Sequence, residues 1–201
     1  KHRSDMSMTG RVMPKALIRP RNTAEVAAAL KICNQLGQSV VPQGGLTGLA
    51  GGANAHEGDI ALSLDLLSGI EELDREAATL TVLAGTPLER AQAAAADAGF
   101  LLPLDLGSRG TAQVGGNLAT NAGGNRVIRY AMARAQVLGL EAVLADGTIL
   151  SSLNKMLKNN AGFDLKQLFI GSEGTLGIIT RVVFRLKPLP RVTSTAFCAL
   201  E

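Results

Sequence analysis

Short apolar runs alternate with one amphipathic helix at the start of the chain. Residues 16–18 and 39–41 have the length and composition of strands, and between them Asn22 and Glu25 form the pattern of a helix capping box. The positions that follow are apolar at helical spacing and end at a glycine: Val26, Ala29, Leu30, Cys33 and then Gly37. The pattern predicts a βαβ unit whose second strand leads into a glycine-dense segment.

The rest of the chain has the pattern of many strands and few helices. Apolar or alternating runs predict strands at residues 60–64, 69–73, 79–84, 137–144, 148–150 and 177–186. Asp146 and Gly147 predict an antiparallel hairpin with a type I′ turn, because both residues tolerate positive φ. Thr86 and Glu89 predict a second capping box, with Pro87 at the first position of an alanine-rich helix.

These elements predict an α+β fold with two lobes. The first lobe, at about residues 14–66, holds the βαβ unit, and the second, at about residues 67–190, holds a mainly antiparallel sheet with flanking helices. With 201 residues, 46% of them hydrophobic, the chain can bury a core of that size, which excludes a disordered protein. The run at 196–201 is apolar and strand-like with no turn or cap. We therefore expect residues 191–201 to open a further, C-terminal substrate domain and the chain to be a fragment.

Charge and rare residue types exclude several functions. The net charge is +3, but Lys and Arg are scattered and only 3% of residues are aromatic, so no nucleic-acid partner is expected. Cys33 and Cys198 lie far apart and have too few partners in His2 and His56 to form a metal site, so no metal is expected. No apolar run has membrane-spanning length, so no transmembrane segment is expected. In the absence of a signal peptide the expected location is cytoplasmic, with peripheral membrane association of the full-length protein left open.

Two glycine-dense segments are the candidates for ligand binding. We call residues 42–52 the first glycine segment and residues 114–124 the second. Their glycines let the backbone approach a ligand, and hydroxyl and amide side chains add donors at Thr47, Asn117, Thr120 and Asn121. The first segment lacks the spacing of a dinucleotide fingerprint and the Gly-Lys-Ser/Thr of a P-loop. A backbone nest for the phosphates of a large cofactor and a plain glycine-rich turn both remain, and the matched second segment favours the nest.

Four motifs carry a resemblance to a known family. Residues 41–49, 103–108, 115–124 and 171–177 closely resemble the FAD-binding (PCMH-type) domain of the vanillyl-alcohol oxidase flavoprotein superfamily. The best match is the branch that contains D-lactate dehydrogenases, the glycolate oxidase FAD subunit and D-2-hydroxyglutarate dehydrogenase. The similarity covers nearly all 201 residues in order. It implies a two-lobed PCMH-type domain and FAD as the cofactor.

The resemblance also implies roles for particular residues. In the family the first glycine segment wraps the FAD pyrophosphate. The resemblance therefore implies that the pyrophosphate contacts are Pro42, Gln43, Gly44, Gly45, Leu46, Thr47, Gly48 and Leu49. By the same resemblance, a second set of residues lines the ribityl chain and the isoalloxazine ring: Pro103, Gly107, Ser108, Gly115, Gly116, Asn117, Thr120, Asn121, Gly123 and Gly124. The resemblance also places Gly174 and Gly177 beside the cofactor, and the backbone of Ile178 and Ile179 next to its adenine side. Some members tether the flavin through a histidine at the position of Leu46, so we expect noncovalent FAD here.

The reaction is implied by the family alone. In this branch the flavin takes a hydride from a 2-hydroxy acid such as D-lactate, glycolate or D-2-hydroxyglutarate, and a 2-oxo acid results. In the family the substrate pocket lies largely in the domain that follows, so the catalytic residues and the electron acceptor are unknown here, and we expect this chain alone to be inactive. Four cations flank the motifs and could face an anionic substrate, although surface or lobe-bridging roles are favoured: Arg109, Arg126, Arg129 and Lys158.

Two other functions stay open at the level of sequence. The same cofactor lobe occurs in other flavoenzymes of the superfamily, such as alditol oxidases and cell-wall precursor reductases. A non-enzymatic module could also bind a nucleotide through such glycine nests. Bound flavin would colour the protein yellow, which separates the flavoenzymes from a colourless module.

Overall fold

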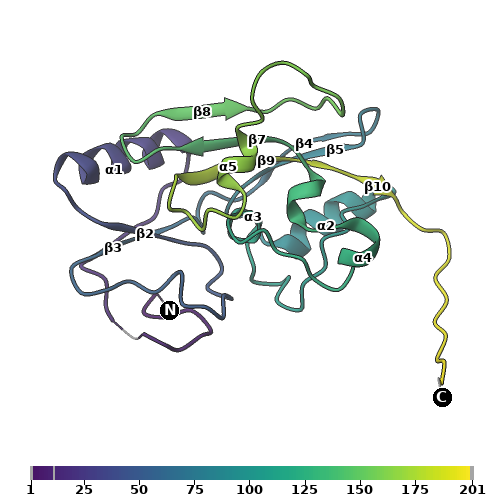
Figure 1. The fold of residues 1–201 in the computed structure, drawn as a ribbon, viewed down its shortest axis with the longest axis horizontal. Coiled ribbons are helices and arrows are strands. Elements are labelled where there is room, and N and C mark those ends of the chain that lie inside the picture. The colour runs from purple at the N-terminus through teal and green to yellow at the C-terminus, as the bar shows by residue number, and fades with distance from the viewer. Residues whose placement is uncertain (1, 11, 200–201) are drawn as a thin grey trace.

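The computed structural model describes residues 2–10 and 12–199. The first lobe contains a three-stranded parallel sheet in the order β1-β3-β2, and helix α1 connects β1 to β2 (Figure 1). The bounds of these elements are β1 (Ala16–Ile18), α1 (Thr23–Gln35), β2 (Val40–Gln43) and β3 (Ile60–Ser63). The predicted βαβ unit is confirmed, and β3 lies between its two strands, parallel to both.

Helix α1 begins as the capping-box pattern predicts. The Asn22 side-chain oxygen accepts a hydrogen bond from the Glu25 backbone amide at 2.8 Å. The Glu25 carboxylate reaches back to the backbone amide of Arg21 at 2.7 Å, one residue before the amide of Asn22 that the capping box predicts. Val26 and Cys33 are among the residues that α1 buries, so the helix presents the predicted apolar face to the core.

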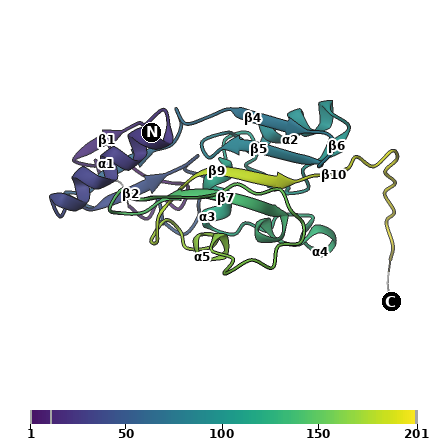
Figure 2. The ribbon, with the colours of Figure 1, turned by 90° about the horizontal axis from the view of Figure 1, so that it is seen from above.

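The second lobe is a five-stranded antiparallel sheet in the order β4-β5-β9-β7-β8. Its strands are β4 (Ile70–Asp74), β5 (Thr79–Leu83), β7 (Val137–Val143), β8 (Ile149–Ser152) and β9 (Ile178–Arg185). Strand β9 lies in the centre, antiparallel to β5 on one side and to β7 on the other. The α+β class, with a small parallel lobe beside a larger antiparallel one, is confirmed (Figure 2).

Short helices and a two-stranded pair surround the second sheet. The helices are α2 (Leu88–Asp97), α3 (Val114–Ala119), α4 (Val127–Tyr130), the 3₁₀ helix η1 (Ala133–Gln136) and α5 (Lys166–Phe169). The pair is β6 (Phe100–Leu101) with β10 (Lys187–Pro188). None of the helices in the described residues is long and apolar enough to cross a membrane.

Beyond β10, the Leu189 amide still donates to the Gly99 carbonyl at 3.2 Å, and residues 190–199 extend away from both lobes without forming a helix or strand (Figure 1). The strand-like reading of residues 196–201 is therefore wrong for its described part, 196–199. These residues pack on no neighbouring strand, so their apolar pattern has nothing to bury against. Residues 200 and 201 lie outside the described residues.

Two local predictions are wrong in detail. Thr86 does not cap α2, because its hydroxyl contacts both the backbone amide (2.9 Å) and the carbonyl (3.0 Å) of Gly69. Helix α2 instead starts after Pro87 with no side-chain cap. The β7–β8 hairpin is confirmed, but of Asp146 and Gly147 only Gly147 has positive φ, at 86°, so these two residues do not form the predicted type I′ turn.

One hydrophobic core joins the two lobes. Val26 and Leu30 of α1 belong to the same buried cluster as Leu62 of β3 and as Val82 and Phe184 of the second sheet. Because the cluster is continuous, the loops that leave β2 and enter β9 are held at fixed positions relative to each other. Those loops carry two of the four motifs.

Candidate functional site

The first glycine segment leaves the carboxyl end of β2 and is anchored by Gln43. The Gln43 side chain is fully buried. Its amide donates to the carbonyl of Ala53 at 2.9 Å and to that of His2 at 3.2 Å, and its oxygen lies 2.9 Å from the His2 ring nitrogen. Gln43 therefore organises the loop from within and ties both the N-terminal segment and the far end of the loop to β2.

The backbone amides of the first glycine segment are free to bind a ligand. No described residue accepts a hydrogen bond from the amides of residues 44–49. Leu46 has positive φ (59°), an uncommon backbone conformation for a leucine, within this run of amides. Successive free amides around a residue with positive φ are typical of anion-binding nests, so the segment has the donors that the predicted nest requires.

The two glycine segments are in contact. An added Cβ at Gly45 would lie 2.0 Å from the carbonyl oxygen of Thr111, so only glycine fits there. A Cβ at Gly44 would lie 3.7 Å from Cα of Gly116, across the junction. The two glycine segments, which are far apart in sequence, thus lie side by side, as the resemblance implies.

The second glycine segment is partly helical. Its first six residues form α3, which is anchored where the Gly115 amide donates to the Ala84 carbonyl at 2.8 Å. The sequence analysis predicted no helix in this segment. Gly116 is the glycine of α3 whose missing Cβ faces open space.

The other two motifs join the same region. The amides of Gly171 and Glu173 donate to the carbonyls of Leu118 (3.0 Å) and Ala119 (2.8 Å) at the end of α3. Gly174 has φ of 81°, and a Cβ there would lie 2.5 Å from Cγ of Pro42. The 103–108 motif contacts the second glycine segment through a β-bridge between Asp105 and Gly124. All four motifs therefore lie together in one region of the structure.

The donor side chains predicted in the second glycine segment differ in what they contact. Asn117 is 6% exposed, and its Nδ2 has no partner among the described residues. The Thr120 hydroxyl instead donates to the Gly116 carbonyl at 3.0 Å, and Asn121 accepts from the Arg134 amide at 3.0 Å. A buried donor without an acceptor is costly, so Asn117 is the side chain best placed to contact a ligand.

Gln113 was missed by sequence reasoning. It is buried, and its Oε1 has no partner in the described part of the chain. The same atom lies 3.6 Å from the position of a Cβ on Gly44. Its only sequence signal is a polar residue directly before the second glycine segment.

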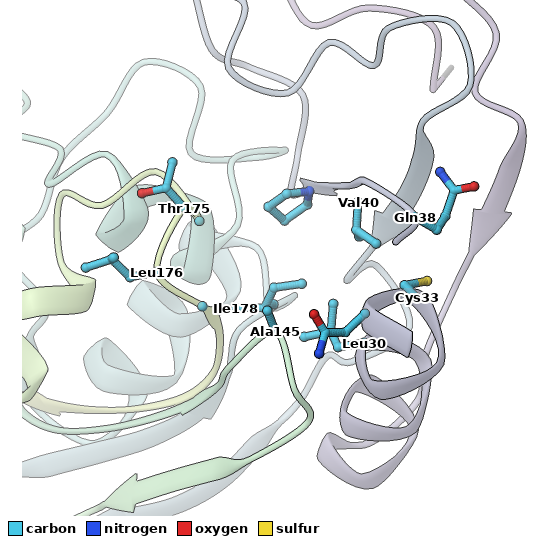
Figure 3. A pocket seen from close by; sticks show the side chains of 12 residues that line it. Leu30, Cys33, Gln38, Val40, Ala145, Thr175, Leu176 and Ile178 are labelled. Atoms are coloured by element: carbon cyan, nitrogen blue, oxygen red, sulfur yellow. The ribbon is translucent and has the colours of Figure 1, made fainter. Parts of the chain in front are cut away.

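A groove of about 230 Å³ lies where the two lobes meet (Figure 3). Its lining residues come from α1, from the start and end of β2, from the β7–β8 turn and from the loop into β9: Leu30, Cys33, Asn34, Gln38, Val40, Pro42, Ala145, Gly174, Thr175, Leu176, Gly177 and Ile178. Figure 3 shows Leu30 and Cys33 on the helix facing Ile178 and Thr175 across the groove. Ile178 and Ile179 both belong to the buried core, and of the two only Ile178 lines this groove.

Carboxylates neutralise two of the four candidate cations. Arg109 and Arg126 both pair with Asp105, at 3.1 and 3.5 Å. Arg129 stacks over the Tyr130 ring at 5.2 Å. The pairing of Arg109 and Arg126 fits a bridging role between motifs, because Asp105 itself bridges to the second glycine segment. Among the described residues no cluster of three His, Cys, Asp or Glu could hold a metal ion.

Comparison with known proteins places this chain in a family. The profile of a family described as FAD binding domain matches residues 14–152. D-2-hydroxyglutarate dehydrogenase, mitochondrial, of Bos taurus is 47% identical over 193 residues, which are 96% of this chain and 36% of that protein. A Schizosaccharomyces pombe protein named as a mitochondrial D-lactate dehydrogenase is 46% identical over 90% of this chain and 34% of its own length. This chain thus spans about a third of the length of these relatives.

A solved structure shares the fold. An alkyldihydroxyacetonephosphate synthase superimposes with a TM-score of 0.78 over 88% of this chain and 32% of that one, at 23% sequence identity. At this identity the match concerns the fold alone. Both relatives above carry a mitochondrial location in their names, so the cytoplasmic location expected from the sequence is not confirmed.

Proposed function

Because this chain belongs to the family of FAD binding domains, we propose that its four convergent motifs hold FAD along the junction of the two lobes. The first glycine segment takes the pyrophosphate, residues 107–124 take the ribityl chain and the ring, and the groove beside α1 takes the adenine end. The observation that carries this assignment is the set of free amides at residues 44–49 beside the unpartnered amide of Asn117. Flavin, when bound, supplies hydride and electron transfer.

The chemistry of the donors fits the parts of the cofactor. Two pyrophosphate charges need several donors at close range, and the free amides with the Thr47 hydroxyl provide them without a buried cation. The groove is lined largely by apolar side chains such as Leu30, Val40 and Ile178, which suits a flat aromatic base. The residues present therefore fit FAD at both places.

We further propose that the cofactor is noncovalent. Leu46 stands where a tethering histidine would be, and His56 lies outside the contacts described above. Acid precipitation of the flavin-loaded protein should leave the flavin in the supernatant and the pellet colourless. A yellow pellet would contradict this. His2, whose ring contacts Gln43, would then be the first candidate for the attachment, and His2→Ala would identify it.

For the whole protein we propose oxidation of a 2-hydroxy acid to a 2-oxo acid. The names of the two relatives support this substrate class. For such a reaction a bound flavin would supply the hydride acceptor, and the protein would have to supply a base for the hydroxyl proton. We assign no base among the described residues, because the carboxylates of Asp5 and Glu173 lie beside the first glycine segment, where we place the pyrophosphate, and Asp105 is paired with Arg109 and Arg126.

Because no base is assigned within the described residues, we predict that this chain binds FAD but does not oxidise a 2-hydroxy acid. The 201-residue chain, loaded with FAD and mixed anaerobically with D-2-hydroxyglutarate or D-lactate, should keep its oxidised flavin spectrum. Free FAD with the same acids is the control for background chemistry. Rapid bleaching of the bound flavin would contradict the account, because it would require a complete substrate site and base within these residues.

A further inference from the structure

A buried carboxylate connects the two lobes. Glu141, in the middle of β7, is 5% exposed. Its Oε1 accepts hydrogen bonds from the hydroxyls of Thr23 on α1 and Thr180 on β9, both at 2.7 Å. Nη1 of Arg181, the next residue on β9, lies 3.1 Å from both carboxylate oxygens. Arg181 is held in turn by Glu71 on β4, at 2.9 Å.

Burial of a carboxylate at this position needs a reason. An apolar residue on a central strand would cost less free energy, because a buried charge must be fully paired to offset its desolvation. Burial raises the pKa of Glu141, but hydrogen bonds from Thr23 and Thr180 and the charge of Arg181 lower it more, so the pKa lies below the usual value for a glutamate. Glu141 therefore stays ionised and keeps its three partners at neutral pH.

The partners of Glu141 belong to the two walls of the groove. Thr23 is the first residue of α1, whose later residues Leu30 and Cys33 form one wall. Thr180 and Arg181 follow Ile178, which forms the opposite wall, on the same strand. One carboxylate thus fixes the start of the helix to the start of β9. The groove lies between these two elements, so its width depends on that connection.

We propose that Glu141 is a positioning residue that sets the separation of α1 and β9 and thereby the affinity for the adenine end of FAD. The inference rests on the proposed function, in which the groove takes that end. It predicts a selective effect. Variants that break the Thr23–Glu141 contact should weaken binding of FAD but not of FMN, which lacks the adenosine monophosphate part.

The test measures Kd for FAD and for FMN in the 201-residue chain, with thermal unfolding recorded in parallel. Glu141→Gln, which keeps the shape and removes the charge, should raise the Kd for FAD about tenfold and leave that for FMN within about twofold. Thr23→Val, which removes only the hydroxyl, should act in the same direction. Thr23→Ser keeps the donor, and Glu71→Gln alters the outer end of the network without touching α1, so both should resemble the wild type.

The outcomes separate this inference from the proposed function. If the wild type fails to bind FAD, the proposed function itself is wrong. If the wild type binds FAD but Glu141→Gln and Thr23→Val keep its ratio of FAD to FMN affinity, or weaken both ligands equally, the positioning role is wrong. Should Glu141→Gln fail to fold, Thr23→Val decides, since it leaves the carboxylate paired with Thr180 and Arg181.

Discussion

Gly45→Ala is expected to abolish FAD binding and to lower the melting temperature of the chain. The new Cβ would lie 2.0 Å from the carbonyl oxygen of Thr111 and 2.7 Å from its carbonyl carbon. Both atoms are backbone, so the first glycine segment must move away from the region that leads into α3. Overpacking of this kind costs about 1–3 kcal/mol, which for a chain of this size corresponds to a fall in melting temperature on the order of 5 °C. The loss of FAD binding should be the larger effect, because the displaced loop carries the free amides.

Thermal unfolding and FAD titration of the same preparation check this prediction. The matched control is Gly69→Ala, where a Cβ would make an ordinary contact of 3.7 Å with Leu83. The control should bind FAD as the wild type does. Gly45→Ala with unchanged affinity for FAD would show that the close approach of the first glycine segment to Thr111 does not shape the site.

Gly116→Ala should have the opposite combination of effects: a fold at least as stable as the wild type and a much weaker affinity for FAD. A Cβ at Gly116 meets no atom within 4 Å, and the residue lies inside α3, where alanine is favoured over glycine by up to about 1 kcal/mol. The open space that the methyl group would enter lies beside the junction with Gly44, which we assign to the cofactor. We therefore expect the Kd for FAD to rise at least about tenfold.

Isothermal titration calorimetry together with urea unfolding separates the two effects. Normal FAD affinity in a stable Gly116→Ala variant would mean that the cofactor does not approach α3 at this residue. Lower stability and lower affinity together would also count against the assignment, because they would indicate a packing role for Gly116. Only unchanged or higher stability together with weaker FAD binding agrees with the assignment of the cofactor to this place.

Local patterns predicted most of the fold. The Asn22 and Glu25 capping box placed α1, and alternating apolar runs placed the strands, because both signals depend on neighbours in the sequence. Helix α3 could not be found in this way. Glycine has low helix propensity, and α3 is held instead by tertiary bonds such as that from the Glu173 amide to the Ala119 carbonyl.

The candidate site was predicted only where a motif marked it. The resemblance identified the motifs that converge in the structure, but the wall of the groove formed by α1 carries no motif. Leu30 and Cys33 have the pattern of ordinary core residues, and only the packing of α1 against the second sheet brings them to the groove. The contact between Thr23 and Glu141, which lie 118 positions apart, could not be anticipated from either residue alone.

Titration of the 201-residue chain with FAD tests the central claim most directly, with flavin fluorescence and calorimetry as readouts. The account predicts saturable binding of one FAD per chain, competition by ADP at the groove and the first glycine segment, and loss of binding in Gly45→Ala. Absence of saturable binding up to about 1 mM FAD, a range in which even a weak specific site would fill, would contradict it.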